Sequence, residues 1–200
     1  MQRYAWRNSG FSMAETDNEL IDRYRGGNVE ALERLVDKHR RALFGYIMNM
    51  TRDKHEADEV FQDVWLKVIK KLDLYRERNF PGWLVRIARN TIIDRARRRK
   101  PAVSLNDIGG NGESLMGTIS APGQDPVQSA GMRELGNRIA AAVDSLPTDQ
   151  KEVFLMRTQT GLAFKDIAKI QKTSINTTLA RMQYAVARLK PLLEEEYAAL

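Results

Sequence analysis

The sequence predicts an all-α protein with two small helical domains joined by a flexible linker. Residues 101–136 hold seven of the 13 glycines, three of the six prolines and no aromatic residue, as a linker does. Before and after this stretch, apolar residues recur at the spacing of an α-helix, without a convincing alternating strand or hairpin turn. We therefore expect domains at 15–100 and 131–200, a linker at 101–130 and an N-terminal extension without structure at 1–14.

The composition excludes several classes of protein. Of the 200 residues, 42% are hydrophobic and 29% are charged, as in ordinary globular domains. The longest mostly apolar stretch, residues 43–50, is far shorter than the ~20 residues that cross a bilayer, and residues 1–20 lack the apolar run of a secretion signal. We therefore expect a cytoplasmic protein without membrane contact of its own. Because the chain has no cysteine and two isolated histidines, we expect no metal, no cofactor and no catalytic residue.

The charges are segregated along the chain. Residues 80–100 hold seven cations and one acid, Asp94, so this stretch alone has a net charge equal to the +6 of the whole chain. Residues 53–63 hold five carboxylates against one lysine, and residues 104–130 hold three acids and no cation. This segregation indicates different partners for different segments, with a polyanion for the basic one.

The first two helices are predicted from their caps and their apolar spacing. Asp17 or Asn18 can cap a helix that runs to residue 24 and ends at Gly26 and Gly27. Asn28 can cap the next helix, which we expect at 29–51.

A third helix is expected at 56–71, with an apolar stripe on one side and acidic residues on the other. The predicted buried stripe is Ala57, Val60, Phe61, Val64, Val68 and Leu72. The opposite face carries Asp58, Glu59, Gln62, Asp63 and Leu66, and it fits either a solvated surface or a protein interface.

The fourth helix, which follows Pro81, has an apolar side and a basic side. We expect Phe80, Trp83, Leu84, Ile87, Ala88 and Thr91 to be buried. Arg86, Asn90, Ile93 and Arg97 face the other way, where the cations can dock against phosphates or be solvated. Tyr75 lies beside Arg76 and Arg78 in the preceding loop, a composition that can stack unpaired bases, although the ring can equally belong to the core.

The C-terminal part predicts a helix-turn-helix. A helix capped by Thr148 runs to about residue 159, and a short helix at 161–170, a polar turn at 171–173 and a longer helix at 174–189 follow. An αα-hairpin without DNA-binding function has a similar pattern.

Together, three blocks resemble an extracytoplasmic-function (ECF, group IV) bacterial RNA polymerase sigma factor. They are ADEVFQDVWLKV at 57–68, FPGWLVRIARNTIIDR at 80–95, and Leu146-Pro147 followed by the helix-turn-helix. The resemblance covers residues 17–190 in the order of the family, with the linker in place. It implies a non-enzymatic subunit whose first domain is sigma region two and whose second is sigma region four.

The resemblance assigns roles to particular residues. In the family, the first block contacts the β′ clamp helices of core RNA polymerase, which gives Asp58, Glu59, Gln62, Asp63 and Leu66 as core-binding residues. The second block opens and holds the minus-ten promoter element, where a base leaves the stack. The minus-ten candidates are Tyr75, Arg76, Arg78, Trp83, Arg86, Arg89, Asn90, Arg95, Arg97 and Arg98. In the helix-turn-helix, which reads the minus-thirty-five element, the candidates are Ser174, Asn176, Thr177, Arg181, Gln183, Tyr184 and Arg188.

The helix expected at 174–189, which we call the reading helix, departs from the pattern of the family. Members commonly have a basic residue, Ser and Arg at Leu179, Ala180 and Arg181, so only Arg181 keeps its type. Two buried stripes fit this helix. The alignment with the family implies Ile175, Thr178, Met182, Ala185 and Leu189, whereas hydrophobicity alone implies Ile175, Leu179, Met182, Val186 and Leu189. On the first stripe Leu179 is exposed and can meet a thymine methyl group, and on the second it is core.

The resemblance also implies partners: core RNA polymerase through its β′ and β subunits, promoter DNA, and an anti-sigma factor. The alternative from the same motifs is an autonomous helix-turn-helix regulator that binds DNA without polymerase, but it leaves the acidic face of the third helix unexplained. An enzyme that acts on nucleic acid would need a second group of carboxylates for a metal, which the sequence does not offer.

Overall fold

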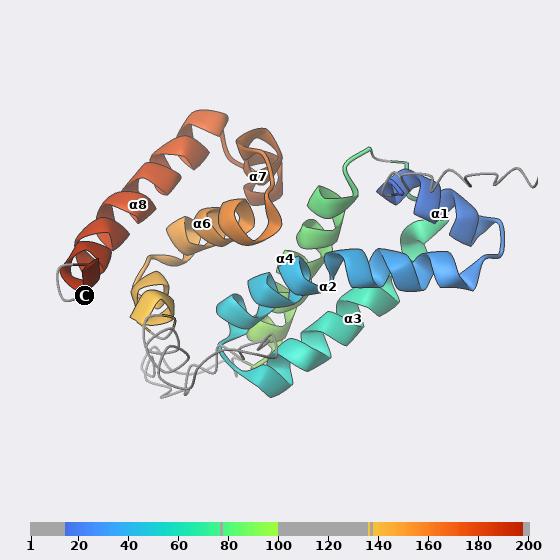
Figure 1. Cartoon of the computed structure of the whole chain (residues 1–200), viewed down its shortest axis with the longest axis horizontal. Helices are drawn as coiled ribbons and strands as arrows, with labels where there is room; N and C mark the ends of the chain where they lie inside the picture. The colour runs from blue at the N-terminus through green and yellow to red at the C-terminus, as the bar shows by residue number, and fades with distance from the viewer. Residues whose placement is uncertain (1–14, 77, 100–135, 137, 198–200) are drawn as a thin grey trace, which may run out of the picture. The chain divides into compact units, whose positions relative to one another are not determined.

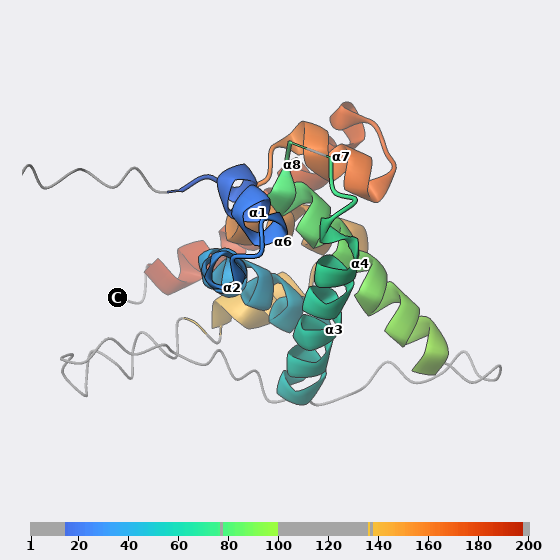
Figure 2. The same ribbon diagram turned by 90° about the vertical axis from the view of Figure 1, so that its right-hand side faces the viewer.

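The computed structural model describes residues 15–76, 78–99, 136 and 138–197, with side chains through residue 191. Every regular element in these ranges is an α-helix, which confirms the all-α prediction (Figures 1 and 2). The predicted extension at 1–14 and the linker at 101–130 lie outside the described residues, so the predicted domain boundaries stay predictions. By its internal contacts the chain divides into two compact units, Met1–Lys38 and His39–Leu200.

The first unit contains α1 (Asp17–Arg25) and the beginning of α2 (Val29–Thr51). The prediction of Asp17 or Asn18 as the first cap was wrong: the cap is Thr16, whose hydroxyl accepts from the backbone N–H of Glu19, while the Glu19 carboxylate accepts from the backbone N–H of Thr16. This capping box satisfies two helix-end donors at once, which neither predicted cap does. The second cap was predicted correctly, because the Asn28 side-chain oxygen accepts from the backbone N–H of Ala31 at 2.9 Å.

Ion pairs hold α1 against the first turns of α2. The Glu15 carboxylate accepts from Arg23 of α1 and, at 2.6 Å, from Arg34 of α2, and Lys38 lies 2.9 Å from Asp17. The two guanidinium groups lower the pKa of Glu15, with the hydrogen bond from Arg34 as the largest cause.

In the second unit, α3 (Lys54–Leu72) and α4 (Phe80–Arg99) pack side by side (Figure 2). The predicted stripe of α3 is buried except Phe61, which is half-buried because Trp65 takes part of the interior instead and meets it edge-on at 6.3 Å between ring centroids. Thr91 of α4 is buried as predicted, and its hydroxyl accepts from the ammonium group of Lys67 at 2.9 Å. This bond gives the two helices a polar link beside their apolar contact.

The C-terminal part contains a helical segment at 138–144, then α6 (Thr148–Thr160), α7 (Phe164–Gln171) and α8 (Ile175–Tyr197). The predicted cap at Thr148 was wrong, because Pro147 occupies the cap position and Thr148 is already helical. Gly161 ends α6 in the left-handed conformation at φ 68°, where a residue without Cβ is favoured. Helices α7 and α8 form the predicted helix-turn-helix (Figure 1).

Candidate nucleic-acid and protein interfaces

The five predicted core-binding residues lie on one face of α3, which we call the α3 surface: Asp58, Glu59, Gln62, Asp63 and Leu66. Asp58, Gln62 and Leu66 are exposed, and Glu59 and Asp63 are half-buried. Leu66 is 57% exposed and lies outside the buried stripe of α3. The face therefore combines negative charge with one exposed apolar side chain.

Two carboxylates of the α3 surface form ion pairs with a cation of the same chain. The Arg95 guanidinium of α4 donates to Glu59 at 2.5 Å and to Asp63 at 2.8 Å. The hydrogen bond from Arg95 lowers the pKa of Glu59, and the two acids raise the pKa of Arg95. One turn further along α4, Arg99 lies 2.6 Å from Glu56. Arg95, predicted to contact DNA, is thus bonded to the surface predicted to contact protein.

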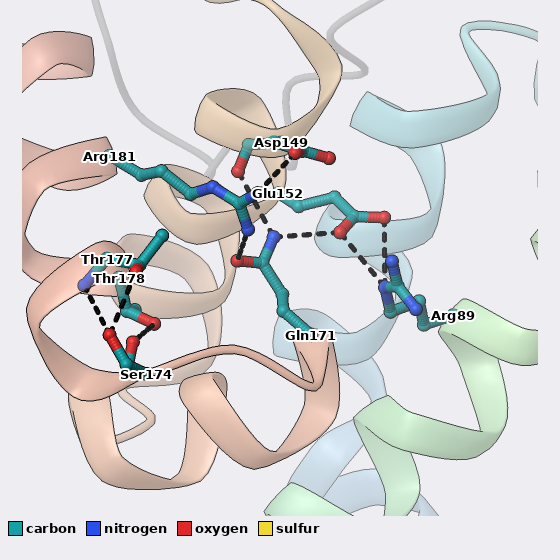
Figure 3. A network of polar contacts seen from close by, with 8 residues as sticks. All are labelled: Arg89, Asp149, Glu152, Gln171, Ser174, Thr177, Thr178 and Arg181. Atoms are coloured by element: carbon teal, nitrogen blue, oxygen red, sulfur yellow. Dashed lines mark hydrogen bonds and ion pairs between the residues drawn. The ribbon is translucent and has the colours of Figure 1, made fainter.

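The outward side of α4 carries the other predicted minus-ten residues. Arg86, Asn90, Arg97 and Arg98 are exposed, as the helix spacing predicts. Arg89 is half-buried, and its Nε donates to both carboxylate oxygens of Glu152 at 2.9 and 3.0 Å (Figure 3). Four of the six residues predicted on this helix beyond Trp83 are therefore presented to solvent, and Arg89 and Arg95 are engaged within the chain.

Tyr75 and Trp83, the two aromatic residues among the minus-ten candidates, lie in the core. Tyr75 is 5% exposed, and its ring packs against those of Trp83 and Phe80 at 4.9 and 5.7 Å between centroids. Arg76 and Arg78, in the same loop, are exposed. Arg76 donates to the backbone carbonyls of Asp73 and Tyr75. The structure therefore presents the cations of this loop, but not its tyrosine, to a partner.

The buried stripe of α8 follows the alignment with the family from Thr178 onward. Thr178 and Ala185 are fully buried and Leu189 nearly so, whereas Leu179 is 38% exposed and Val186 is 45% exposed. The Thr178 hydroxyl donates to the carbonyl of Ser174, which lets a polar side chain occupy the interior. Hydrophobicity alone therefore gives the wrong face.

Ser174 begins α8 by capping it, because its hydroxyl accepts from the backbone N–H of Thr177 at 3.0 Å. The two hydroxyl groups also lie 2.8 Å apart (Figure 3). Both residues are exposed, and so are the candidates Asn176, Gln183, Tyr184 and Arg188.

Arg181 is held by a network that sequence reasoning missed (Figure 3). Its guanidinium donates to the Asp149 carboxylate and, at 2.8 Å, to the side-chain oxygen of Gln171. The Gln171 amide donates in turn to the backbone carbonyl of Asp149 and to Glu152. Because these residues are brought together from α6, α7 and α8, no local spacing in the sequence signals the network.

The described residues do not bring three His, Cys, Asp or Glu side chains together in a way that could hold a metal ion. Nor does any described helix have the length and apolar character needed to cross a membrane.

Comparisons with known proteins identify the family. The model of Sigma-70 region 2 matches residues 35–101, which include α3 and α4. The model of Sigma-70 region 4 matches residues 136–189, which include the helix-turn-helix, and the two matches together span more than half of the chain.

The chain is 29% identical over 192 residues to the RNA polymerase sigma-H factor of Pseudomonas aeruginosa, with 90% of this chain and 97% of the relative covered. It is 26% identical over 178 residues to the ECF RNA polymerase sigma factor SigW of Bacillus subtilis, with 88% and 95% covered. The chain belongs to the ECF sigma factors of RNA polymerase.

Membership of this family confirms the prediction of a sigma factor and not the alternative of an autonomous regulator. The chain is a transcription initiation factor. Two solved structures share the fold of this sigma factor. One is CnrH in complex with the cytosolic domain of CnrY, with a TM-score of 0.64, 24% identity, and 90% of this chain and 99% of that chain covered. The other is the sigma factor RpoE in complex with the anti-sigma factor NepR from Bartonella quintana, with a TM-score of 0.62, 21% identity, and 83% and 98% covered.

Proposed function

We propose that this sigma factor binds core RNA polymerase through the α3 surface and promoter DNA through α4 and the helix-turn-helix. The observation that carries the proposal is the separation of charge within region 2. The α3 surface carries Asp58, Glu59 and Asp63 with Leu66 at its end, and the exposed side of α4 carries Arg86, Arg97 and Arg98. A basic coiled coil such as the β′ clamp helices complements the first side, and phosphates complement the second.

For the minus-ten element, we propose that the exposed residues of α4 and of the loop before it hold the opened strand. Each cation that neutralises a phosphate releases a counterion, and this gain helps offset the few kcal/mol that flipping a base costs. Tyr75 and Trp83 act in this proposal from the interior, because their packed rings fix the start of α4. The chain itself catalyses no step; bond formation belongs to the polymerase.

We also propose an anti-sigma partner that covers the exposed apolar residues when the sigma factor is idle. Support comes from the structure of the sigma factor RpoE, which was solved in complex with the anti-sigma factor NepR. Co-purification of a small partner with the tagged chain from its own host tests this, and transcription by the sigma factor at every expression level would contradict it. The proposed place of action is the bacterial cytoplasm, where polymerase and promoter meet.

The core-binding part of the proposal predicts different effects for two exposed leucines. Leu66→Arg puts a cation on the α3 surface and should lower affinity for purified core polymerase at least tenfold, because the apolar contact is lost and the new charge faces a basic partner. Leu74→Arg is the matched control, since Leu74 is 78% exposed but lies beyond the end of α3. Fluorescence anisotropy of the labelled full chain against core measures both. Equal affinities for the two variants would contradict the assignment of the α3 surface.

A further inference from the structure

One exposed face of α8 carries two amides and a leucine. Asn176, Leu179 and Gln183 are spaced i, i+3 and i+7, which places them on the same side of a helix. All three are exposed, and Leu179 keeps 38% of its surface accessible. The burial of Thr178, Ala185 and Leu189 fixes the orientation of the helix, so this face points away from the domain interior.

Two cations of the reading helix lie on a different flank. Arg181 and Arg188 are seven residues apart and share that flank with Thr177. Arg181 is bonded to Asp149 and Gln171, which directs its guanidinium toward α6 and α7 (Figure 3). Over residues 176–183, the face with Asn176, Leu179 and Gln183 therefore presents neither an ammonium nor a guanidinium group, and Lys190 continues this face two turns further along α8.

This chemistry matches one kind of base pair. In the major groove, guanine is read mainly by Arg or Lys through O6 and N7, adenine by the amide of Asn or Gln through N6 and N7, and thymine by apolar contact with its methyl group. We infer that this face reads A·T pairs in the upstream promoter element, with Leu179 against a thymine methyl group and Asn176 and Gln183 against adenines. The inference rests on the proposed function and names the specificity within it.

The surroundings of the face favour DNA as its occupant. Residues 164–190 contain six cations, Lys165, Lys169, Lys172, Arg181, Arg188 and Lys190, against the single acid Asp166. Lys172 is exposed and lies two residues before Ser174, at the end of α8 that enters a groove in a helix-turn-helix. Cations that flank an uncharged reading face can hold phosphates on both sides of a groove while the face meets the bases.

The test removes the methyl group of thymine from the DNA. Holoenzyme made from core polymerase and the full chain first selects an upstream element from a randomised promoter library. The selected duplex is then resynthesised with deoxyuridine in place of thymidine, one position at a time. Because each substitution removes one methyl group, the wild-type holoenzyme should bind the duplex about fourfold more weakly when deoxyuridine stands at one or two of these positions.

Variants of the chain assign the effect to the residue. With Leu179→Ala, deoxyuridine and thymidine should bind equally at the sensitive position, and with Leu179→Lys the preferred base there should move toward guanine. Val186→Ala is the matched control, because Val186 is also exposed on α8 but lies two turns beyond Leu179, and it should keep the deoxyuridine penalty.

Four results overturn the inference. If no deoxyuridine substitution affects the wild type, or if Leu179→Ala keeps the penalty, the methyl contact is wrong while the selected element still supports the proposed function. If Leu179→Ala weakens binding to core polymerase without DNA and leaves the base preference unchanged, the leucine contacts protein. If the holoenzyme selects no upstream element at all, the proposed function fails together with the inference.

Discussion

Arg95 and Arg181 are each predicted to contact DNA, and each is held by carboxylates of its own chain. The acids they hold keep 40–58% of their side-chain surface exposed, so solvent screens these ion pairs and they contribute little to stability. A phosphate can therefore replace the carboxylate at small cost. The pairs orient the guanidinium groups in the free protein without preventing an exchange of partners.

The Arg95 pair gives a prediction for pH dependence. Because the pKa of Glu59 is lowered in the folded state, the pair stabilises the fold above the carboxyl pKa of the unfolded chain, and this contribution is lost as the pH falls through the folded pKa. Urea unfolding should show Glu59→Gln less stable than the wild type at pH 7 and by a smaller margin near pH 3. Asp58→Asn, on the same face, should not follow this pattern. A difference of equal size at both pH values would contradict the role of the pair.

At the scale of the elements, the turn between α7 and α8 decides where the reading helix begins. Lys172 ends α7 in the left-handed conformation at φ 56°, which costs a residue with a side chain ~1–2 kcal/mol. Ser174 then caps α8. A glycine would adopt this conformation without that cost, so Lys172 places a cation beside the reading helix at the expense of a strained backbone.

Lys172→Gly should therefore stabilise the protein. Relief of the strain is partly offset by the entropy of glycine, which leaves a gain of roughly 0.5–1 kcal/mol in the free energy of unfolding. Lys169→Gly, inside α7, should lose about the same amount, because glycine is unfavourable in a helix. Urea unfolding of both variants measures the contrast, and a loss of stability in both would show that the turn is not strained.

At the scale of the whole molecule, the sequence predicts the helices and their buried faces because apolar spacing is a local property. It does not predict the partners of polar groups that meet only in the fold. Arg95 lies 32 residues from Asp63, and Arg181 lies 32 residues from Asp149, so their pairing has no signal in the spacing. The burial of Tyr75 has no local signal for a similar reason: its neighbours in sequence are cations, whereas its neighbours in space are Phe80 and Trp83. Thr178 is the opposite case, since a backbone hydrogen bond lets it replace an apolar residue in the core.

The central claim is that separate surfaces of one chain bind polymerase and open a promoter. Run-off transcription with core polymerase from the native host, on a randomised promoter library, tests it most directly. The wild-type chain should produce discrete new start sites, which both Leu66→Arg and Arg86→Glu abolish, while Arg86→Glu still binds core as tightly as the wild type. Unchanged transcription on addition of the wild-type chain, with the chain alone still shifting specific duplex DNA, would contradict the claim.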